Sequence, residues 1–249
     1  MLRIFKKKYT IKLFVCKDEE EIAEKSSKIF IDQILCKQNS ILGLATGSSP
    51  VPLYKKLIKA NKEKKISFEQ IKTFNLDEYI GLSSEYIDQS YKFFMNENLF
   101  KNVNISLCNT HFPYKENCEN YDKDIKNAGG IDLQVLGLGE NGHIAFNEPG
   151  TKLSAKTHIV KITNSTKKAN ARFFDGDESK VPNEAVTMGI KTILSAKKIV
   201  LIATGPKKAD AIAKLFANEY DPQWPCTSLL FHPDVSVFVD YQAASKIDK

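Results

Sequence analysis

Residues 137–150, GLGENGHIAFNEPG, place a histidine among flexible glycines and a glutamate before a proline. A neutral imidazole is the usual group for moving protons near pH 7, so His143 is a candidate acid–base residue. On a regular helix His143 and Glu148 would lie about 140° apart, but Pro149 takes Glu148 out of helical geometry. We therefore expect the chain to bend back and bring this carboxylate to the imidazole. The alternatives are a structural histidine or, less well supported, a zinc ligand, since HIAFNE is not a zinc motif.

A carboxylate follows an apolar run in TFNLDEYIGL, residues 73–82. Asp77 is expected at the carboxyl end of a strand, partly screened from water by aromatic neighbours. Such screening raises the pKa of a carboxyl group and suits it to work as a general base. The alternative is that Asp77 or Glu78 only caps a loop.

Small and hydroxyl-bearing residues separate a strand from a helix in ATGSSP, residues 45–50. Small side chains let the backbone approach a ligand closely, and the free N–H groups of a helix start attract an anion. We therefore expect a phosphate site here. It comprises Thr46, Gly47, Ser48 and Ser49. The alternative is an ordinary strand-to-helix turn, because the Walker pattern GxxxxGK[ST] is absent from the sequence.

Two cations are candidates to complete that anion site. Arg172 lies in NARFFDGD, and Lys208 lies in ATGPKKADAIAK, between an apolar run and an expected helix. Arginine and lysine side chains both bind phosphate. The alternative for each is a solvated place on the surface.

These candidates depend on the elements that position them. Short apolar runs typical of buried strands alternate with helix-length segments, the first of which begins with the capping box Asp18 and Glu21. The alternation predicts an α/β fold with a mostly parallel sheet between helices. The expected strands are residues 11–15, 40–45, 71–76, 105–107, 131–138, 198–204 and 235–239. Because ligands bind at the carboxyl ends of parallel strands, the candidate residues are expected to share one site.

We expect residues 1–249 to form a single domain. The chain is 42% apolar and 27% charged, which suffices for a sizeable core. No internal repeat, low-complexity tract or linker divides it. Residues 151–182 are polar and less regular, so a lid over the edge of the sheet is expected there.

The composition restricts the partners and the compartment. A net charge of +6 suits a small anionic substrate or nucleic acid, but the basic residues are scattered without a recognition pattern, so no nucleic acid is expected. Five cysteines form no CxxC pair, which argues against a metal site and for the reducing cytoplasm. The amino terminus is interrupted by lysines and no segment approaches about eighteen apolar residues, so neither a signal peptide nor a membrane span is expected.

Together these segments resemble the glucosamine-6-phosphate deaminase family, also called glucosamine-6-phosphate isomerases, over nearly the whole chain. LATGSSPVPLY is similar to the family's phosphate loop, TFNLDEYIGL to its catalytic-aspartate segment and GLGENGHIAFNEPG to its central motif. ANARFFDGD and GPKKADAI are similar to its further phosphate-binding elements. The resemblance implies a Rossmann-like three-layer sandwich of the sugar-phosphate isomerase type.

The resemblance also implies an activity. The enzyme would convert glucosamine 6-phosphate and water to fructose 6-phosphate and ammonia, in amino-sugar catabolism and without a metal or redox cofactor. His143 would open the pyranose ring, with Asn141 and Glu148 positioning it. Asp77 would move a proton from C2 to C1 of the open-chain sugar, and water would then displace ammonia.

The chain departs from the family pattern at two places. Position 141 varies between Asp and Asn in the family, and Asn141 is expected to orient its neighbours by hydrogen bonds because it cannot be a carboxylate. Some members are hexamers activated by N-acetylglucosamine 6-phosphate through basic residues that correspond to residues 151–161. This chain has Lys152, His158, Val160 and Lys161 there, which does not reproduce that arrangement. Activation is therefore not expected, and both a monomer and a homo-oligomer stay open.

Two other functions are alternatives. A 6-phosphogluconolactonase has a related fold and a similar histidine motif, but that motif lacks the NEP ending that supplies Glu148. A sugar-phosphate-sensing regulator would need a DNA-reading module, and only about ten residues precede the first expected strand.

Overall fold

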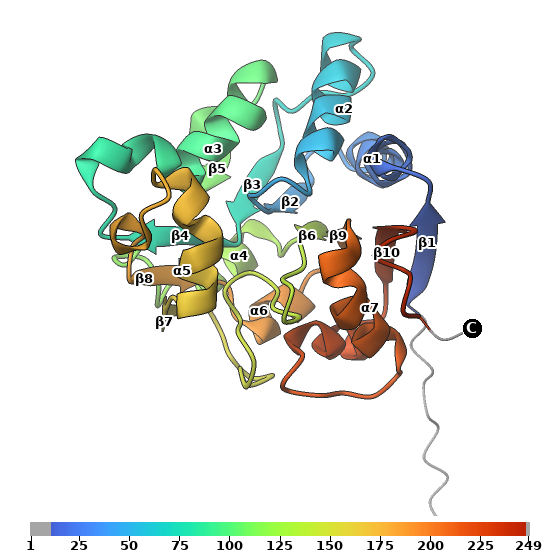
Figure 1. The fold of residues 1–249 in the computed structure, drawn as a ribbon. Helices are drawn as coiled ribbons and strands as arrows, with labels where there is room; N and C mark the ends of the chain where they lie inside the picture. Colours follow the sequence, from blue (N-terminus) through green and yellow to red (C-terminus); the bar gives the residue numbers. More distant parts are fainter. Residues whose placement is uncertain (1–10, 248–249) are drawn as a thin grey trace, which may run out of the picture.

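The computed structural model describes residues 11–247, apart from the side chains of Ser165 and Ala169. Residues 1–10 and 248–249 lie outside the described part, so the expectation that the amino terminus is no signal peptide stays a prediction. A seven-stranded sheet lies between layers of helices, and a three-stranded sheet lies beside it (Figure 1). The predicted three-layer α/β class is confirmed.

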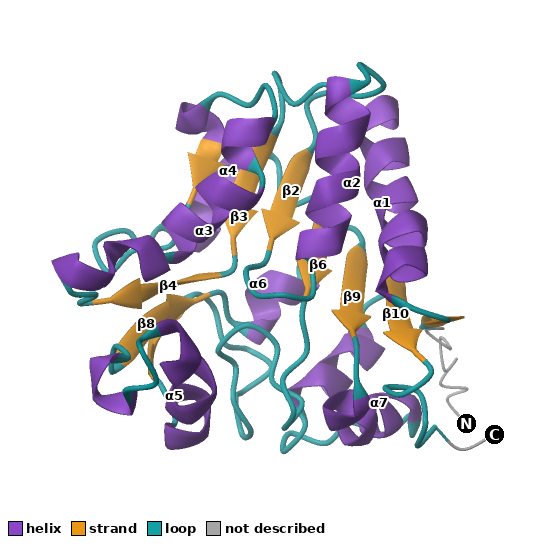
Figure 2. Ribbon diagram, turned by 45° about the horizontal axis from the view of Figure 1, so that its top comes forward, coloured by secondary structure: helices purple, strands orange, loops and turns teal. Residues whose placement is uncertain are grey.

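The central sheet is parallel at every strand pairing, in the order β1-β10-β9-β6-β2-β3-β5 (Figure 2). Strands β6 and β9 are buried along their full length, as apolar strands covered on both faces must be. After β2 the chain adds β3 and β5 on one side of the sheet, and after β6 it adds β9 and β10 on the other side. The strand order therefore reverses between the neighbours β2 and β6, and the loops that follow them flank this switch point, where ligands bind. The strands are β1 (Lys12–Cys16), β2 (Ile41–Leu44), β3 (Lys72–Asn75), β5 (Thr110–His111), β6 (Leu133–Leu136), β9 (Ile199–Ala203) and β10 (Val235–Asp240).

Helices α1, α2 and α3 cover one face of the sheet, and α6 and α7 cover the other (Figure 1). The predicted capping box begins α1: the Asp18 carboxylate accepts the Glu21 N–H at 2.9 Å, and the Glu21 carboxylate accepts the Lys17 N–H at 2.8 Å. Within residues 11–247, no helix has both the length and the apolar character needed to cross a membrane. The helices are α1 (Glu19–Cys36), α2 (Val51–Lys62), α3 (Tyr91–Asn98), α4 (Tyr121–Ala128), α5 (Asn164–Asn170), α6 (Ile190–Leu194) and α7 (Ala209–Phe216).

Short 3-10 helices join several of these elements. They are η1 (Ser84–Gln89), η2 (Phe100–Asn102), η3 (Leu107–Asn109), η4 (Ala171–Phe173), η5 (Glu178–Lys180), η6 (Pro206–Lys208) and η7 (Pro225–Phe231). The strand expected at residues 105–107 is wrong, because η3 begins at Leu107 and strand β5 follows at Thr110. Leu107 is 62% exposed, so this apolar trio is not the buried run that it resembles in the sequence.

A second, antiparallel sheet was not predicted. Its order is β4-β8-β7, with β4 (Asp77–Ile80), β8 (Glu184–Thr187) and β7 (His158–Lys161). A separate apolar cluster packs around it: Tyr79, Tyr86, Phe146, Ile162, Ala171, Phe174, Val181 and Ala185. Residues 151–182 therefore contain β7 and α5 rather than mainly irregular chain, and their movement as a lid stays a prediction.

Candidate active site

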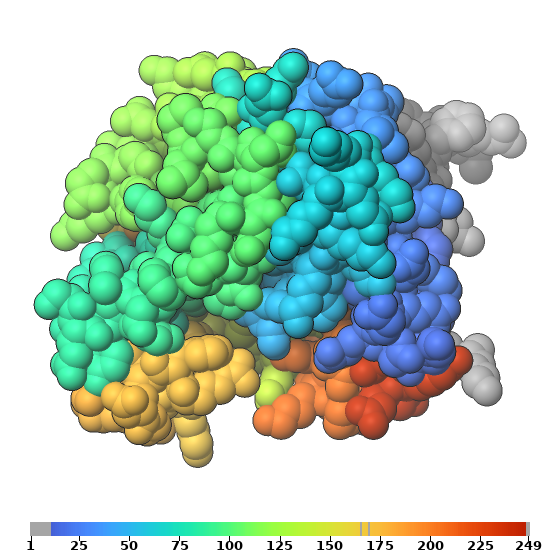
Figure 3. Space-filling model, turned by 90° about the horizontal axis from the view of Figure 1, so that it is seen from above, coloured from blue at the N-terminus to red at the C-terminus, as the bar shows by residue number. Residues whose placement is uncertain are grey.

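One cleft of about 1380 Å³ lies at the carboxyl ends of β2, β3, β6 and β9. The space-filling view is hollowed between the gold surface of residues 151–182 and the orange surface of α7 (Figure 3). All the predicted site residues except Glu148 line this cleft, and Glu148 is hydrogen-bonded to Asn141, which does. The lining includes Thr46, Gly47, Ser48, Ser49, Asp77, Asn141, His143, Arg172 and Lys208.

The loop after β2 leads directly into α2. Gly47 has a φ of 90°, a left-handed conformation that favours glycine. The buried Tyr54 of α2 holds the loop, because its hydroxyl donates to the Ala45 carbonyl at 2.7 Å and accepts the Ala45 N–H at 3.2 Å. Among the described residues no side chain caps the first turn of α2, but Val51 donates its N–H to the Ser48 carbonyl at 3.2 Å and Pro52 has no N–H. The donors for a bound anion are therefore expected mainly from the loop before the helix.

Two cations approach the same cleft from different elements. Lys208 ends η6, which follows β9, and Arg172 lies in η4 of the 151–182 segment. Burial lowers the pKa of Lys208, Glu140 opposes this, and the charges of Lys207 and Arg172 lower the pKa further. The Arg172 guanidinium lies 4.7 Å from the centre of the exposed Phe173 ring. Cations near enough to lower the pKa of Lys208 favour a bound anion beside it.

Asp77 is the first residue of β4, where the chain leaves the central sheet. It is 7% exposed, and within the described part of the chain its carboxylate has no hydrogen-bond partner. Burial, and to a smaller extent the charge of Glu78, raises the pKa of Asp77 to about 8. This carboxyl group therefore holds a proton firmly, as a base that removes a proton from carbon must.

Glu78 shows that the capping alternative holds for one of the two acidic residues. Its carboxylate accepts the backbone N–H groups of Tyr79, Tyr91 and Lys92, each at 2.9 Å. Tyr91 and Lys92 are the first two residues of α3. Glu78 thus caps α3, whereas Asp77 lines the cleft.

The loop after β6 bends back on itself, as predicted. Gly139 donates its N–H to the His143 carbonyl at 2.8 Å, and Ile144 and Asn147 form an isolated antiparallel bridge. The imidazole of His143 lies directly on Gly139, where an added Cβ would be 2.3 Å from the ring. Glycine at this position therefore makes room for the imidazole.

Asn141 connects His143 to Glu148. Its Oδ1 atom lies 2.7 Å from Nδ1 of His143, and its Nδ2 group donates to Oε2 of Glu148 at 2.7 Å. A direct approach between His143 Nδ1 and Glu148 Oε2 measures 3.7 Å. Because the carboxylate and the amide oxygen both accept, the network assigns the imidazole proton to Nδ1 and leaves Nε2 as an acceptor. Burial lowers the pKa of His143, and the charge of Glu148 opposes this, so the ring is neutral near pH 7.

Helix α5 adds three residues that the sequence reasoning missed. Thr163 and Thr166 donate their hydroxyl groups to Oε1 of Glu148 at 3.2 and 2.7 Å. At the other end of α5, Asn170 donates to the Tyr79 hydroxyl at 2.9 Å. Thr163 is also the N-cap of α5, so the sequence Thr-Asn-Ser-Thr before a helix was the feature that could have identified it.

Metal binding is not suggested by the grouping of ligands. Within residues 11–247, no three or more His, Cys, Asp or Glu side chains gather in a way that could hold a metal ion. The candidate site therefore consists of proton donors and acceptors, two cations and a helix start.

Comparison with known proteins gives a consistent set of relatives. A family model described as "Glucosamine-6-phosphate isomerases/6-phosphogluconolactonase" matches residues 17–237. Proteins called glucosamine-6-phosphate deaminase from Clostridium novyi (strain NT) and Malacoplasma penetrans (strain HF-2) are each 48% identical to this chain, over 243 and 236 residues. The matches cover 95% and 92% of this chain and 100% and 97% of the relatives.

Solved structures separate close from distant similarity. One described as a monomeric glucosamine-6-phosphate deaminase has a TM-score of 0.91 at 39% identity, and the match covers 95% of this chain and 100% of that chain. A 6-phosphogluconolactonase from Thermotoga maritima has a TM-score of 0.71 at 22% identity, covering 93% of this chain and 100% of that chain. The second similarity shows a shared fold alone.

Proposed function

This chain belongs to the family of glucosamine-6-phosphate isomerases and 6-phosphogluconolactonases, and from that membership we propose how its cleft acts on a sugar phosphate. The enzyme is a glucosamine-6-phosphate deaminase, which converts glucosamine 6-phosphate and water to fructose 6-phosphate and ammonia. One observation carries the assignment of roles: a buried carboxylate and an oriented imidazole line the same cleft as a helix start and two cations.

The phosphate group would bind at the start of α2. The backbone of Thr46, Gly47, Ser48 and Ser49 offers N–H donors there, and Lys208 and Arg172 supply positive charge. A phosphate held at one end of the sugar fixes C1 and C2 near the acid–base groups at the other. Such positioning lowers the barrier because less freedom is lost at the reacting step.

His143 would open the pyranose ring. Its free Nε2 atom accepts the proton of the C1 hydroxyl, and the resulting imidazolium returns a proton to the ring oxygen. Asn141 holds the imidazole through Nδ1, and Glu148 stabilises the positive charge that develops on the ring. Asn141 therefore orients its neighbours without transferring a proton.

Asp77 would carry out the isomerisation. Its carboxylate takes the proton from C2 of the open-chain amino sugar, and the negative charge that forms spreads to the aldehyde oxygen. The same carboxyl group returns the proton to C1, while a proton passes from the amino nitrogen to the former aldehyde oxygen, which gives a ketimine at C2. Water attacks this carbon and ammonia leaves. An ammonium group of the substrate near Asp77 favours the ionised carboxylate that the first step requires.

The segment of residues 151–182 would act as a lid over the bound sugar. Helix α5 contacts Glu148 at its start and Tyr79 at its end, so it lies across both halves of the proton-transfer site. Arg172 and Phe173, which follow it, line the cleft. Closure would exclude water until the ketimine has formed.

Cellular location and assembly are part of the proposal. All five cysteines are free, and Cys16, Cys118 and Cys226 are buried, which suits a reducing cytoplasm. The solved deaminase that resembles this chain at 39% identity is described as monomeric, which supports a monomer here over a homo-oligomer. Light scattering of the purified protein measures the assembly directly.

One assay tests the activity and its main alternative. Purified protein is mixed with glucosamine 6-phosphate while ammonia and fructose 6-phosphate are followed, and 6-phosphogluconolactone is offered separately. We expect equal amounts of both products from the amino sugar. Hydrolysis of the lactone without ammonia release from the amino sugar would overturn the proposal.

A further inference from the structure

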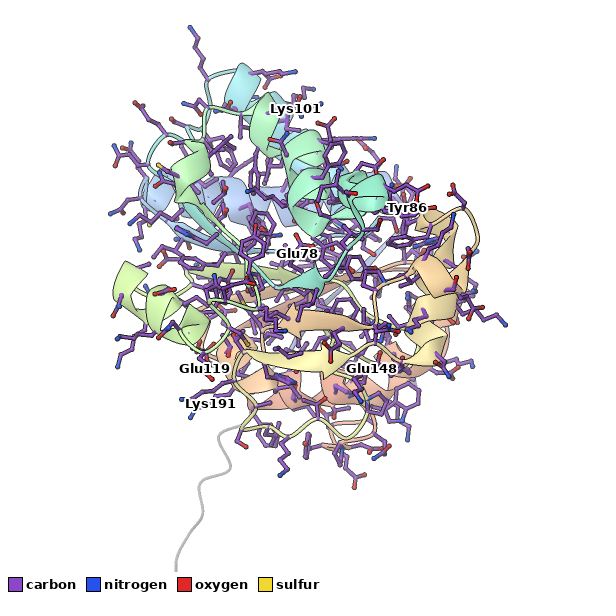
Figure 4. The ribbon with its side chains drawn as sticks, turned by 90° about the vertical axis from the view of Figure 1, so that its left-hand side faces the viewer. Glu78, Tyr86, Lys101, Glu119, Glu148 and Lys191 are labelled. Atoms are coloured by element: carbon purple, nitrogen blue, oxygen red, sulfur yellow. The ribbon has the colours of Figure 1, made fainter. Side chains whose placement is uncertain are left out.

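Glu78 is a second buried carboxylate, next to Asp77 in the chain but outside the cleft. Neighbouring residues of a strand point to opposite faces, so Asp77 and Tyr79 line the cleft while Glu78 points to the start of α3. Glu78 is 4% exposed. Figure 4 shows it in the interior beside β4, whereas Lys101 and Glu119 lie near the surface.

Three hydrogen bonds favour the ionised form of Glu78. Oε1 accepts the N–H groups of Tyr79 and Tyr91, and Oε2 accepts the N–H of Lys92. Burial raises the pKa of Glu78 above its ordinary value, and these three N–H groups and the charge of Lys92 offset part of that rise. Within the described part of the chain, the hydrogen-bond partners of this carboxyl group are all donors, and the N-terminus of α3 attracts negative charge. The geometry therefore holds a carboxylate.

Apart from Lys92 and the cations of the cleft, the titratable side chains nearest this pair are neutral near pH 7. Burial raises the pKa of Tyr79 and of Tyr114 to about 12. Burial also raises the pKa of Tyr91, from α3, and of Tyr121, from α4, well above the ordinary value. His143, which lines the same cleft, has a lowered pKa. Among the residues that the structure describes, Glu78 is thus the charged group that acts on Asp77.

We propose that Glu78 is a positioning residue for the deaminase reaction, whose fixed negative charge strengthens Asp77 as the base that takes the C2 proton. The inference rests on the proposed role of Asp77. A proton bound to carbon leaves only to a base of high proton affinity, and a like charge beside a carboxylate raises that affinity. Glu78 acts without touching the sugar, and its hydrogen bonds also attach the strand that carries Asp77 to α3.

The test compares three variants in ammonia release as a function of pH. Glu78→Gln removes the charge, and Glu78→Asp keeps the charge on a shorter side chain. Ser90→Ala is the matched control, because the Ser90 hydroxyl accepts the Phe93 N–H at 3.1 Å and caps the same helix without charge. All three are expected to weaken the start of α3, so loss of stability alone does not distinguish them.

The position of the acidic limb of kcat/KM distinguishes them. In Glu78→Gln we expect the limb to move to lower pH by at least about 0.5 unit, a threefold change in the ionisation constant of Asp77, with a lower plateau. Glu78→Asp and Ser90→Ala should keep the limb where the unaltered enzyme has it. An unmoved limb in Glu78→Gln, or an equal movement in Ser90→Ala, overturns the proposal.

A measurement on the unaltered protein covers the case in which Glu78→Gln does not fold. Carbon-13 NMR of the side-chain carboxyl groups in the ligand-free protein gives the order in which Glu78 and Asp77 ionise. Glu78 should ionise at the lower pH, and the reverse order overturns the proposal. This titration needs no turnover, so it stays informative even if the protein releases no ammonia, which would defeat only the proposed function.

Discussion

Replacement of Asp77 by asparagine should stabilise the folded protein at alkaline pH while it removes most of the activity. The two side chains have nearly the same shape, but asparagine carries no charge. Asp77 is 7% exposed and has no hydrogen-bond partner among the described residues, so its ionised form is disfavoured in the folded state. The substitution removes that unfavourable charge.

The size and the sign follow from the raised pKa of Asp77. The pKa rises from 3.8 to about 8 on folding. A carboxyl group with a raised pKa favours the folded state at low pH, and this contribution disappears as the pH increases from about 4 to about 8. At 1.36 kcal/mol for each tenfold change, the loss at pH 8 has an upper limit of about 5 kcal/mol. Because water enters an open cleft, we expect Asp77→Asn to be more stable than the unaltered protein by about 2–3 kcal/mol at pH 8.

Urea unfolding provides the measurement. Trp224 is the only tryptophan of the chain and lines the cleft, so its fluorescence reports unfolding in both proteins. The midpoints should nearly coincide at about pH 4, where both side chains are neutral, and separate progressively toward about pH 8. Turnover measured as ammonia release should fall by about a thousandfold in Asp77→Asn.

Two results would refute this reasoning. Stability curves that run parallel across the whole pH range would show that Asp77 is not buried as an unfavourable charge. Near-normal ammonia release by Asp77→Asn would show that another group takes the C2 proton.

Three further substitutions test the rest of the site. Lys208→Ala should raise KM for glucosamine 6-phosphate more than it lowers kcat, because phosphate contacts are shared by the ground and transition states; steady-state kinetics would show an unchanged KM if Lys208 does not bind substrate. Gly139→Ala should displace the imidazole of His143 and reduce kcat at least about tenfold, with folding intact by circular dichroism. Asn141→Asp should raise the pKa of His143, measured by proton NMR, because a second carboxylate beside Glu148 favours the imidazolium; a lowered pKa would contradict this.

The sequence predicted the central layer of the fold because short stretches of sequence are enough to indicate its strands and helices. Continuous apolar runs such as β6 and β9, and the Asp18 capping box before α1, specify their own conformation within a few residues. The placement of candidate residues just after these strands then indicated one shared site. Parallel strands present their carboxyl ends at the same edge, so the cleft that these residues line follows from the strand order.

The second sheet and the contacts of α5 were decided by the tertiary structure. β4 has four residues and is separated from β3 by a single residue. It pairs with β8, which lies more than 100 residues later in the chain. Asn170 and Tyr79 form a hydrogen bond across a separation of 91 residues. Neither pairing leaves a periodic pattern in the sequence, because each depends on how separate apolar surfaces pack.

The division between Asp77 and Glu78 shows the same limit at a single site. The sequence identified two adjacent carboxylates and an acid–base role for the first, and it offered capping as an alternative for either. Only the direction of β4 against α3 settled that Glu78 receives three N–H groups while Asp77 meets none among the described residues. Residue types and their order thus determined which chemistry is available, whereas burial and hydrogen bonds formed between distant segments set the proton affinity of each group.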